Sequence, residues 1–187
     1  MSISAGFAAD KETPFQAAPA ASYASHQSNA QVTIGVDPYV TGDKVKLAFG
    51  KLDPYQYGIL PVLVVIQNDS DKAIRLARLK VQYTGPNHDR VEATPAKDVR
   101  YLKPPQRPSA IDGPGGKVKV LKPKKNPLDA WEIEGRALAA QMLPPGQSAS
   151  GFFYFQTGLQ RNATLYLSGL YEAATGKEIF YFELPLQ

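Results

Sequence analysis

Hydrophobic and polar positions alternate over several short segments of this chain. Apolar side chains take every second position over residues 32–36 and again over residues 44–49, with polar or small residues between them. Because successive side chains of a strand point to opposite faces, this pattern predicts two strands that each bury one face. The Asp37-Pro38 pair between them is typical of a turn and separates the two predicted strands.

A longer apolar segment, residues 60–66, carries hydrophobic side chains on both alternating phases. Such a segment predicts a central strand that is buried on both faces. It ends at residues 67–71, a polar turn in which Asn and Asp side chains can bond nearby backbone groups. The next segment, residues 73–83, changes phase from even to odd apolar positions. We therefore expect a one-residue bulge near Ala77-Arg78 that keeps its apolar side chains on one face.

The C-terminal part is organised around the aromatic segment 152–155, which follows a Pro-Pro-Gly turn. Four consecutive aromatic residues predict a strand over 151–156 that is buried on both faces. Two further strands are expected at 164–171 and 178–186, joined by a compact hairpin connection at 173–177. The side chains expected in the core between the sheets are Val64, Ile66, Phe153, Phe155, Leu165, Leu167, Phe180, Phe182 and Leu184.

One short helix is expected near residues 129–135, because Asp129 and Glu132 have the spacing of a capping box. We expect residues 136–143 to form a strand after it. Many short strands with turn signals between them predict an all-β protein, an antiparallel immunoglobulin-like β-sandwich. Residues 31–187 would form this single domain after a flexible N-terminal tail, residues 1–30, which is poor in large apolar side chains.

Composition agrees with a β-rich globular domain. The 43% hydrophobic content is enough for a core, and 16 prolines and 15 glycines favour short strands joined by turns. The chain has no cysteine, which excludes disulfides and thiolate chemistry. No apolar segment reaches the roughly 18 residues that a membrane-spanning helix needs.

The net charge of +4 is concentrated in one long segment, residues 103–127, which is rich in Pro and Gly. We interpret this segment as an insertion loop on the sandwich. It could bind an anionic surface of the cell envelope or an acidic protein partner, or it could be a solvated loop. Nucleic acid is not expected, since the loop offers no aromatic side chain to stack a base. The candidate anion- or partner-binding residues are Lys103, Arg107, Lys117, Lys119, Lys122, Lys124 and Lys125.

Three stretches resemble the immunoglobulin-like domains of secreted bacterial proteins and lipoproteins, many of which are classed as domains of unknown function. They are Pro61 to Leu76, with its buried strand and Asn-x-Ser turn, Leu143 to Phe155, and Ala163 to Leu167. The resemblance covers roughly residues 44–186. It implies a fold class and no particular activity, because such folds host many functions.

Catalytic chemistry has little support in the sequence. His26 lies in the expected tail and His88 in an expected turn, so neither is held in a rigid constellation. Asn68, Asp69 and Asp71 have oxygen atoms at a spacing that calcium could use, but no glycine or glutamate completes a calcium loop. We expect no enzymatic activity, no cofactor and no metal site.

Tyrosines suggest a second kind of binding. Tyr55 and Tyr57 lie in a loop, and several other tyrosines alternate with core positions and would lie on the outer faces of the sheets. Exposed aromatic faces stack on sugar rings and also mark protein interfaces. Carbohydrate binding through these tyrosines is therefore the alternative to a structural or protein-interaction function.

The N-terminus suggests export. Gly6 and Ala8 fit the two small positions that a signal peptidase reads, although a basic start and an apolar centre are missing before them. We expect an exported protein, periplasmic, at the cell surface or extracellular. An N-terminal arm can also link subunits by adding a strand, but residues 17–21 offer only small side chains and a proline, which favours a simple tether.

Overall fold

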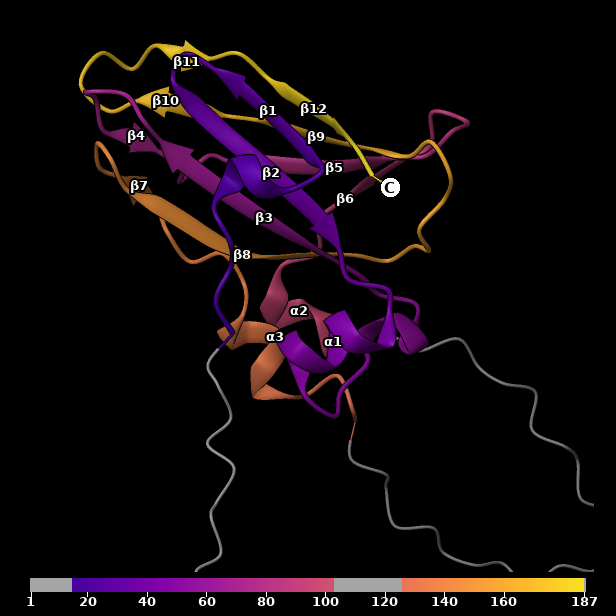
Figure 1. Cartoon of the computed structure of the whole chain (residues 1–187). Helices are drawn as coiled ribbons and strands as arrows, with labels where there is room; N and C mark the ends of the chain where they lie inside the picture. Colours follow the sequence, from indigo (N-terminus) through magenta and orange to yellow (C-terminus); the bar gives the residue numbers. More distant parts are fainter. Residues whose placement is uncertain (1–14, 103–125, 187) are drawn as a thin grey trace, which may run out of the picture.

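The computed structural model describes residues 15–102 and 126–186, and in these ranges the protein is mostly β, with three antiparallel sheets and a few short helices (Figure 1). Sheet A has the order β1 (Ser25–Asn29), β2 (Val32–Pro38), β3 (Leu60–Asn68), β8 (Ser148–Phe155). Sheet B has the order β11 (Glu178–Ile179), β10 (Leu170–Glu172), β4 (Ile74–Arg75), β7 (Met142–Leu143). Sheet C has the order β12 (Phe182–Pro185), β9 (Thr164–Ser168), β5 (Lys80–Thr84), β6 (Arg90–Glu92).

The two central strands of sheet A, β2 and β3, are buried on both faces, as the apolar segment 60–66 predicts. Even-numbered side chains of β3, such as Val64 and Ile66, join the core that sheet A shares with sheets B and C. Odd-numbered ones, Leu63 and Val65, join a second core on the opposite face. The same division holds in β8, where Phe155 enters the first core and Phe152 the second. The alternation of a strand therefore serves two cores at once.

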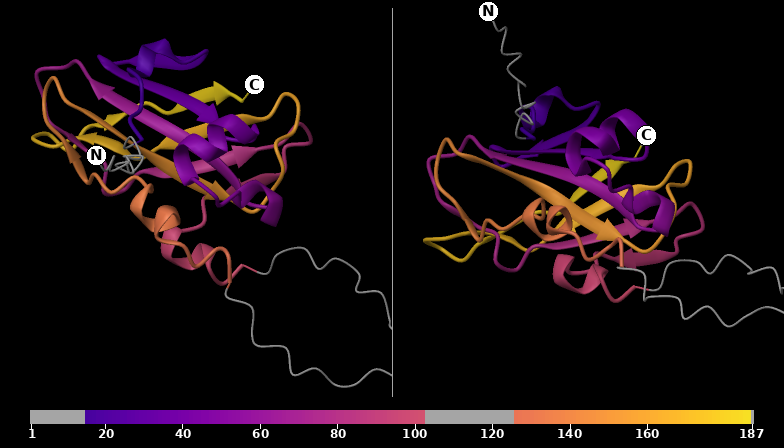
Figure 2. Two further views of the ribbon diagram at one scale, coloured as in Figure 1. Left: turned by 60° about the horizontal axis from the view of Figure 1, so that its bottom comes forward. Right: turned by 90° about the horizontal axis from the view of Figure 1, so that it is seen from below.

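Short helices cover the second face of sheet A (Figure 1; Figure 2). They are η1 (Ala20–Ser22), α1 (Gly42–Phe49), η2 (Pro54–Tyr57), α2 (Ala96–Val99) and α3 (Trp131–Gly135). Of these, α1, α2 and α3 lie together, with α3 against both of the others. Tyr154 on β8 donates its hydroxyl hydrogen bond to the Ile133 carbonyl at 2.7 Å, which ties sheet A to α3. We call α1, α2 and α3 the helical layer.

The strand predicted over residues 44–49 is wrong: this segment is helix α1. Val45, Ala48 and Phe49 are buried against sheet A, at the spacing of one helical face. Leu47, which the strand pattern placed beside Val45 and Phe49, is exposed. Both periods fit a segment this short, and contact with sheet A decides between them. Gly50, with φ 63°, ends the helix.

The predicted bulge at Ala77-Arg78 is also wrong. The chain makes a turn there, with the Leu79 N–H donating to the Leu76 carbonyl, and passes from sheet B to sheet C. The neighbouring strands β9 and β10 separate at Gly169, opposite this turn. Ile74 and Val81 still reach the same core on either side of the turn. The passage from sheet B to sheet C therefore keeps these apolar side chains in one core, which is the effect that the bulge was expected to have.

Gly169 is required at this break. Its φ is 81°, and a Cβ at this position would lie 2.2 Å from the Arg78 carbonyl oxygen. Gly169→Ala should therefore lower the free energy of unfolding by about 2–3 kcal/mol, by clash and backbone strain together. Gly176→Ala is the matched control, since Gly176 has φ 69° but open space around it, and should cost about 1 kcal/mol. Chemical denaturation measures both, and equal losses would mean that the close approach to Arg78 does not matter.

Three more expectations need correction. Phe180, expected in the core, is 74% exposed, because the strand predicted over 178–186 breaks between β11 and β12. Residues 136–143 form strand only at β7, and Ala137 makes an isolated bridge to Phe152. The short helix near 129–135 is present as α3, but its N-cap is Ala130 and no side chain caps it. The capping box that predicted it is therefore absent.

The boundary expected at residue 30 also falls inside folded structure. Strand β1 pairs with β2 from Ser25↔Val36 to Asn29↔Val32. Before it, Ala20 is fully buried and Phe15 packs against the core of the helical layer. Small side chains and the rings of Phe15 and Tyr23 are enough to anchor this segment, because they pack on a face that sheet A already offers. The earlier part of the expected tail, residues 1–14, lies outside the described residues.

Candidate interaction site

A groove between α1 and α3 is the candidate site. It has a volume of about 660 Å³ and is lined by Asp43, Lys46, Leu47, Ala48, Phe49, Gly50, Lys51, Trp131, Glu132 and Arg136. Two large apolar side chains on its walls are exposed, Leu47 at 62% and Trp131 at 68%. The groove therefore combines exposed apolar surface with charged groups of both signs.

Local structure explains why these two side chains point outward. Leu47 lies on the face of α1 opposite to the one that packs on sheet A. Trp131 begins α3, and its ring lies over Gly135, where a Cβ would come within 2.9 Å of the indole. Any larger residue at position 135 would push the indole away. Gly135 therefore leaves the space that the Trp131 ring occupies beside the groove.

Arg136 lies between two aromatic rings at the end of α3. Its Cζ is 5.4 Å from the centre of the Phe15 ring and 5.8 Å from that of Trp131, within the range of cation–π attraction. Within residues 15–102 and 126–186, Arg136 forms no ion pair, and its buried Nε has no hydrogen-bond partner in the protein. The guanidinium is thus positioned by stacking and not by a carboxylate.

A second arginine, Arg100, shows the opposite arrangement. Its guanidinium pairs with Asp129 at 2.9 Å and with Glu134, so it links α2 to α3. Its carbonyl accepts a hydrogen bond from the Asn126 side chain at 2.5 Å. Leu102 packs into the core of the helical layer nearby. Leu102 and Asn126, the described residues on either side of residues 103–125, therefore both lie beside the helical layer.

The seven basic candidates predicted from the sequence lie outside the described residues, so their positions are not assigned. Tyr55 and Tyr57, the glycan candidates, are both on η2 and half-buried. The Tyr55 hydroxyl accepts a hydrogen bond from the Leu159 N–H at 3.2 Å, and its ring packs against the core between the sheets. Tyr57 packs against the core of the helical layer. The structure does not bring these tyrosines into one exposed platform.

A different aromatic group is partly exposed, with Phe180 and Tyr181 at the surface and Tyr166 half-buried. Tyr166 and Tyr181 stack with ring centres 5.2 Å apart and planes at 29°, beside the exposed Phe180. Ser168, Glu178 and Ile179 complete the lining of a shallow hollow there, of about 280 Å³. The position of Phe180 between two strands, which sequence alternation missed, is what completes this group.

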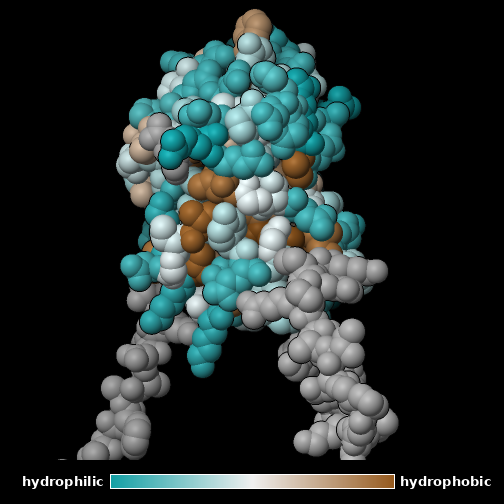
Figure 3. Space-filling model, turned by 90° about the vertical axis from the view of Figure 1, so that its right-hand side faces the viewer, coloured by the Kyte–Doolittle hydropathy of each residue, from teal (hydrophilic) through white to brown (hydrophobic). Residues whose placement is uncertain are grey.

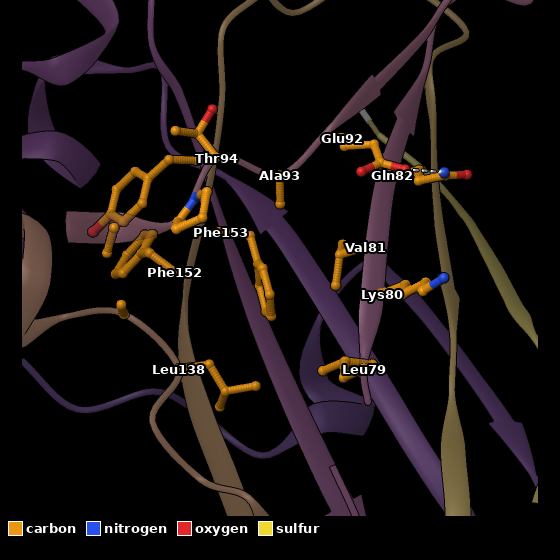
Figure 4. A pocket seen from close by; sticks show the side chains of 14 residues that line it. Leu79, Lys80, Val81, Gln82, Glu92, Ala93, Thr94, Leu138, Phe152 and Phe153 are labelled. Atoms are coloured by element: carbon orange, nitrogen blue, oxygen red, sulfur yellow. Dashed lines mark hydrogen bonds between the residues drawn. The ribbon is translucent and has the colours of Figure 1, made fainter. Parts of the chain in front are cut away.

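A further pocket lies along β8, between it and the strands β5 and β6 (Figure 4). Its volume is about 330 Å³, and Phe153 points into it between Leu138 and Val81. Gln82 donates a hydrogen bond to Glu92 at its rim, at 3.1 Å. Phe153 was expected to be fully buried between the sheets, but it is only half-buried at this opening. The pocket lies where β8 of sheet A and the strands β5 and β6 of sheet C separate from each other.

Figure 3 shows one side of the molecule, on which hydrophobic side chains gather in the middle of the face with hydrophilic residues around them.

Titratable groups do not form a catalytic cluster in the described ranges. His26 is on β1 with Nδ1 2.8 Å from the Tyr23 carbonyl oxygen, and His88 has φ 64° in the turn between β5 and β6. Among the described residues, no three His, Asp or Glu side chains are grouped as metal ligands.

Burial raises the pKa values of the tyrosines under the helical layer. Desolvation raises the pKa of the Tyr154 hydroxyl far above its ordinary value, and it raises that of Tyr39 as well, with a smaller contribution from the Asp37 carboxylate. Tyr154 is therefore protonated at neutral pH and can donate to α3. At the surface, the hydrogen bond between Lys72 and Glu172 raises the pKa of the Lys72 ammonium group and lowers the pKa of the Glu172 carboxyl group. These shifts support the fold and point to no reactive group.

No protein-family model and no curated protein matches this chain. In the part of the chain that the structure describes, no helix is long and apolar enough to cross a membrane. The groove residues Leu47, Trp131 and Arg136 were missed by sequence reasoning. A helical interpretation of residues 42–49 would have set Leu47 apart, because it is the large apolar residue outside the Val45, Ala48, Phe49 face.

Proposed function

We propose that this chain is a non-catalytic protein-interaction module, built as an immunoglobulin-like β-sandwich and exported to a bacterial envelope or extracellular assembly. The observation that carries the proposal is the groove between α1 and α3, with Leu47 and Trp131 exposed on its walls. Exposed apolar surface rimmed by polar groups is typical of protein interaction sites. Aromatic and arginine side chains, both present here, often carry most of the binding energy at such sites.

Several features support the individual parts of this proposal. Sheet A packs face to face with sheets B and C through one shared core, which is the packing of a β-sandwich. The small residues at Gly6 and Ala8 favour export.

Capture of partners from cells tests the interaction. The tagged protein, cross-linked in its native host, should retain specific partners that the double variant Leu47→Ser with Trp131→Ser loses. Met142→Ser is the matched control, because Met142 is an exposed apolar residue, at 52%, on β7 outside the groove. All variants should unfold at the same temperature as the unchanged protein. Retention of the same partners by the double variant would contradict the use of this groove.

Carbohydrate binding is the second candidate, and the Tyr166–Tyr181 stack beside Phe180 favours it. The exposed Tyr181 ring, stacked on the half-buried Tyr166 with the Glu178 carboxylate and the Ser168 hydroxyl nearby, suits a sugar ring. A glycan array separates the two functions: selective binding that Tyr181→Ala abolishes would favour carbohydrate, and an array without signal would favour the protein-interaction module.

A further inference from the structure

The chemistry of the groove identifies the kind of segment that it fits. Resting on the proposed function, we infer that the groove binds an acidic, apolar segment of a protein partner. Such a segment would place an apolar side chain against Leu47 and Trp131 and an adjacent carboxylate against the guanidinium of Arg136. Three features of the groove carry this inference: the position of Arg136, its lack of a carboxylate partner in the part of the chain that the structure describes, and the charge around it.

Stacking positions the Arg136 guanidinium before any ligand arrives. With Cζ 5.4 Å from the Phe15 ring centre and 5.8 Å from the Trp131 ring centre, two aromatic rings hold it. Stacking on aromatic faces leaves the N–H groups at the edge of the guanidinium plane available, in the fork geometry that matches a carboxylate. A side chain that is already ordered also loses less entropy on binding.

Among residues 15–102 and 126–186, no carboxylate accepts a hydrogen bond from those N–H groups. Arg100, only one helix away, uses both Asp129 and Glu134, whereas Arg136 pairs with no carboxylate among the described residues. The Nε atom of Arg136 is buried, so a ligand in the groove reaches the guanidinium through its Nη groups. An incoming carboxylate would pair with these groups and neutralise the charge at the same time.

The surrounding charge selects the same ligand. Lys46, Lys51 and Arg136 line the groove together with Asp43 and Glu132, so the charged side chains of the lining sum to +1. This favours an anionic group, and the exposed Leu47 and Trp131 favour an apolar one beside it. At about 660 Å³ the groove holds several side chains, which fits a peptide segment better than a single small anion. Charge and apolar surface therefore point to one occupant.

Trp131 itself reports binding, because it is the only tryptophan of the chain. The test titrates the full protein with two acetylated, amidated peptides, Gly-Leu-Phe-Glu-Asp-Gly and its neutral counterpart Gly-Leu-Phe-Gln-Asn-Gly, and follows indole fluorescence. The acidic peptide should bind at least about tenfold more tightly than the neutral one, as expected for a charge-assisted forked contact. Arg136→Gln should remove this preference, and Arg136→Lys should restore only part of it. Arg161→Gln is the matched control, an exposed arginine between β8 and β9 that should change nothing.

Three results would overturn the inference: equal affinity for the two peptides, a preference that persists in Arg136→Gln, or no fluorescence response to the acidic peptide. Competition by inorganic phosphate with the strength of the acidic peptide would also reject it, because it would reveal a simple anion site. These failures are distinct from failure of the proposed function. Partners lost by the Leu47→Ser and Trp131→Ser variant but kept by Arg136→Gln would leave the interaction module in place without acidic recognition.

Discussion

Replacing Phe155 by alanine should lower the free energy of unfolding by about 3–5 kcal/mol, and Phe152→Ala should cost about as much. Phe155 is fully buried between the sheets, with its ring centre 6.1 Å from that of Tyr83. Phe152 is buried on the other face of sheet A, 4.8 Å from the rings of both Tyr39 and Phe49. The two changes therefore empty two different cores through one strand. Equilibrium denaturation in urea measures both.

Phe153→Ala is the control within the same strand. Phe153 is half-buried and lines the pocket beside β8, so its loss should cost at most about 2 kcal/mol, less than full burial of an aromatic ring is worth. A loss at Phe153 equal to that at Phe155 would contradict this placement. It would indicate that the strand opens less toward the pocket than the structure shows.

Asn68→Ala should be similarly severe, with a loss of about 3–5 kcal/mol, because several buried polar groups lose their partners at once. Asn68 is fully buried at the end of β3. Its Nδ2 donates to the carbonyls of Lys72, Leu143 and Pro144, at 2.7, 3.1 and 3.1 Å. Its Oδ1 accepts from the backbone N–H of Ser70 at 3.2 Å and from the Ser70 hydroxyl at 2.6 Å. One side chain thus joins the turn after β3 to the turn before β8.

Asp69→Ala is the matched control in that turn. Asp69 is exposed and accepts one side-chain hydrogen bond, from Gln67, so its removal should change the free energy of unfolding by less than about 0.5 kcal/mol. Thermal and chemical unfolding of both variants should show the difference. If Asn68→Ala were as mild as Asp69→Ala, water would be replacing the lost contacts and the turn would be less closed than it is here.

The network also shows which local hydrogen bonds this turn makes. Its sequence allowed either local Asx bonding or calcium ligation. In the structure the Asn68 side-chain atoms are directed to backbone groups of two turns, as the Asx interpretation predicts. The long-range half of the network, toward Leu143 and Pro144, has no local signal, because those residues are 75 and 76 positions away.

Local patterns determined the β-rich class and the central strands. Residues 60–66 are apolar on both phases, and only a strand covered on both faces satisfies them, which β3 confirms. The turn residues 67–71 were also sufficient to mark the end of β3, and the Pro-Pro-Gly turn was sufficient to mark the start of β8. In each case the determining interaction lies within the segment or between its side chains and any apolar surface, so no particular partner had to be known.

Tertiary contacts decided the rest. Residues 44–49 fit both a strand and a helix, and the uncovered face of sheet A selected the helix by burying Val45 and Phe49. Phe180 lies outside the core because the strand is interrupted between β11 and β12. This interruption depends on tertiary pairing, since β11 pairs with β10 and β12 pairs with β9. The groove arose in the same way: Leu47 and Arg136 are 89 positions apart in the sequence and share a surface only because α1 and α3 pack on one sheet. Nothing local to either residue encodes that meeting, since it depends on which elements compete to cover the apolar face of sheet A.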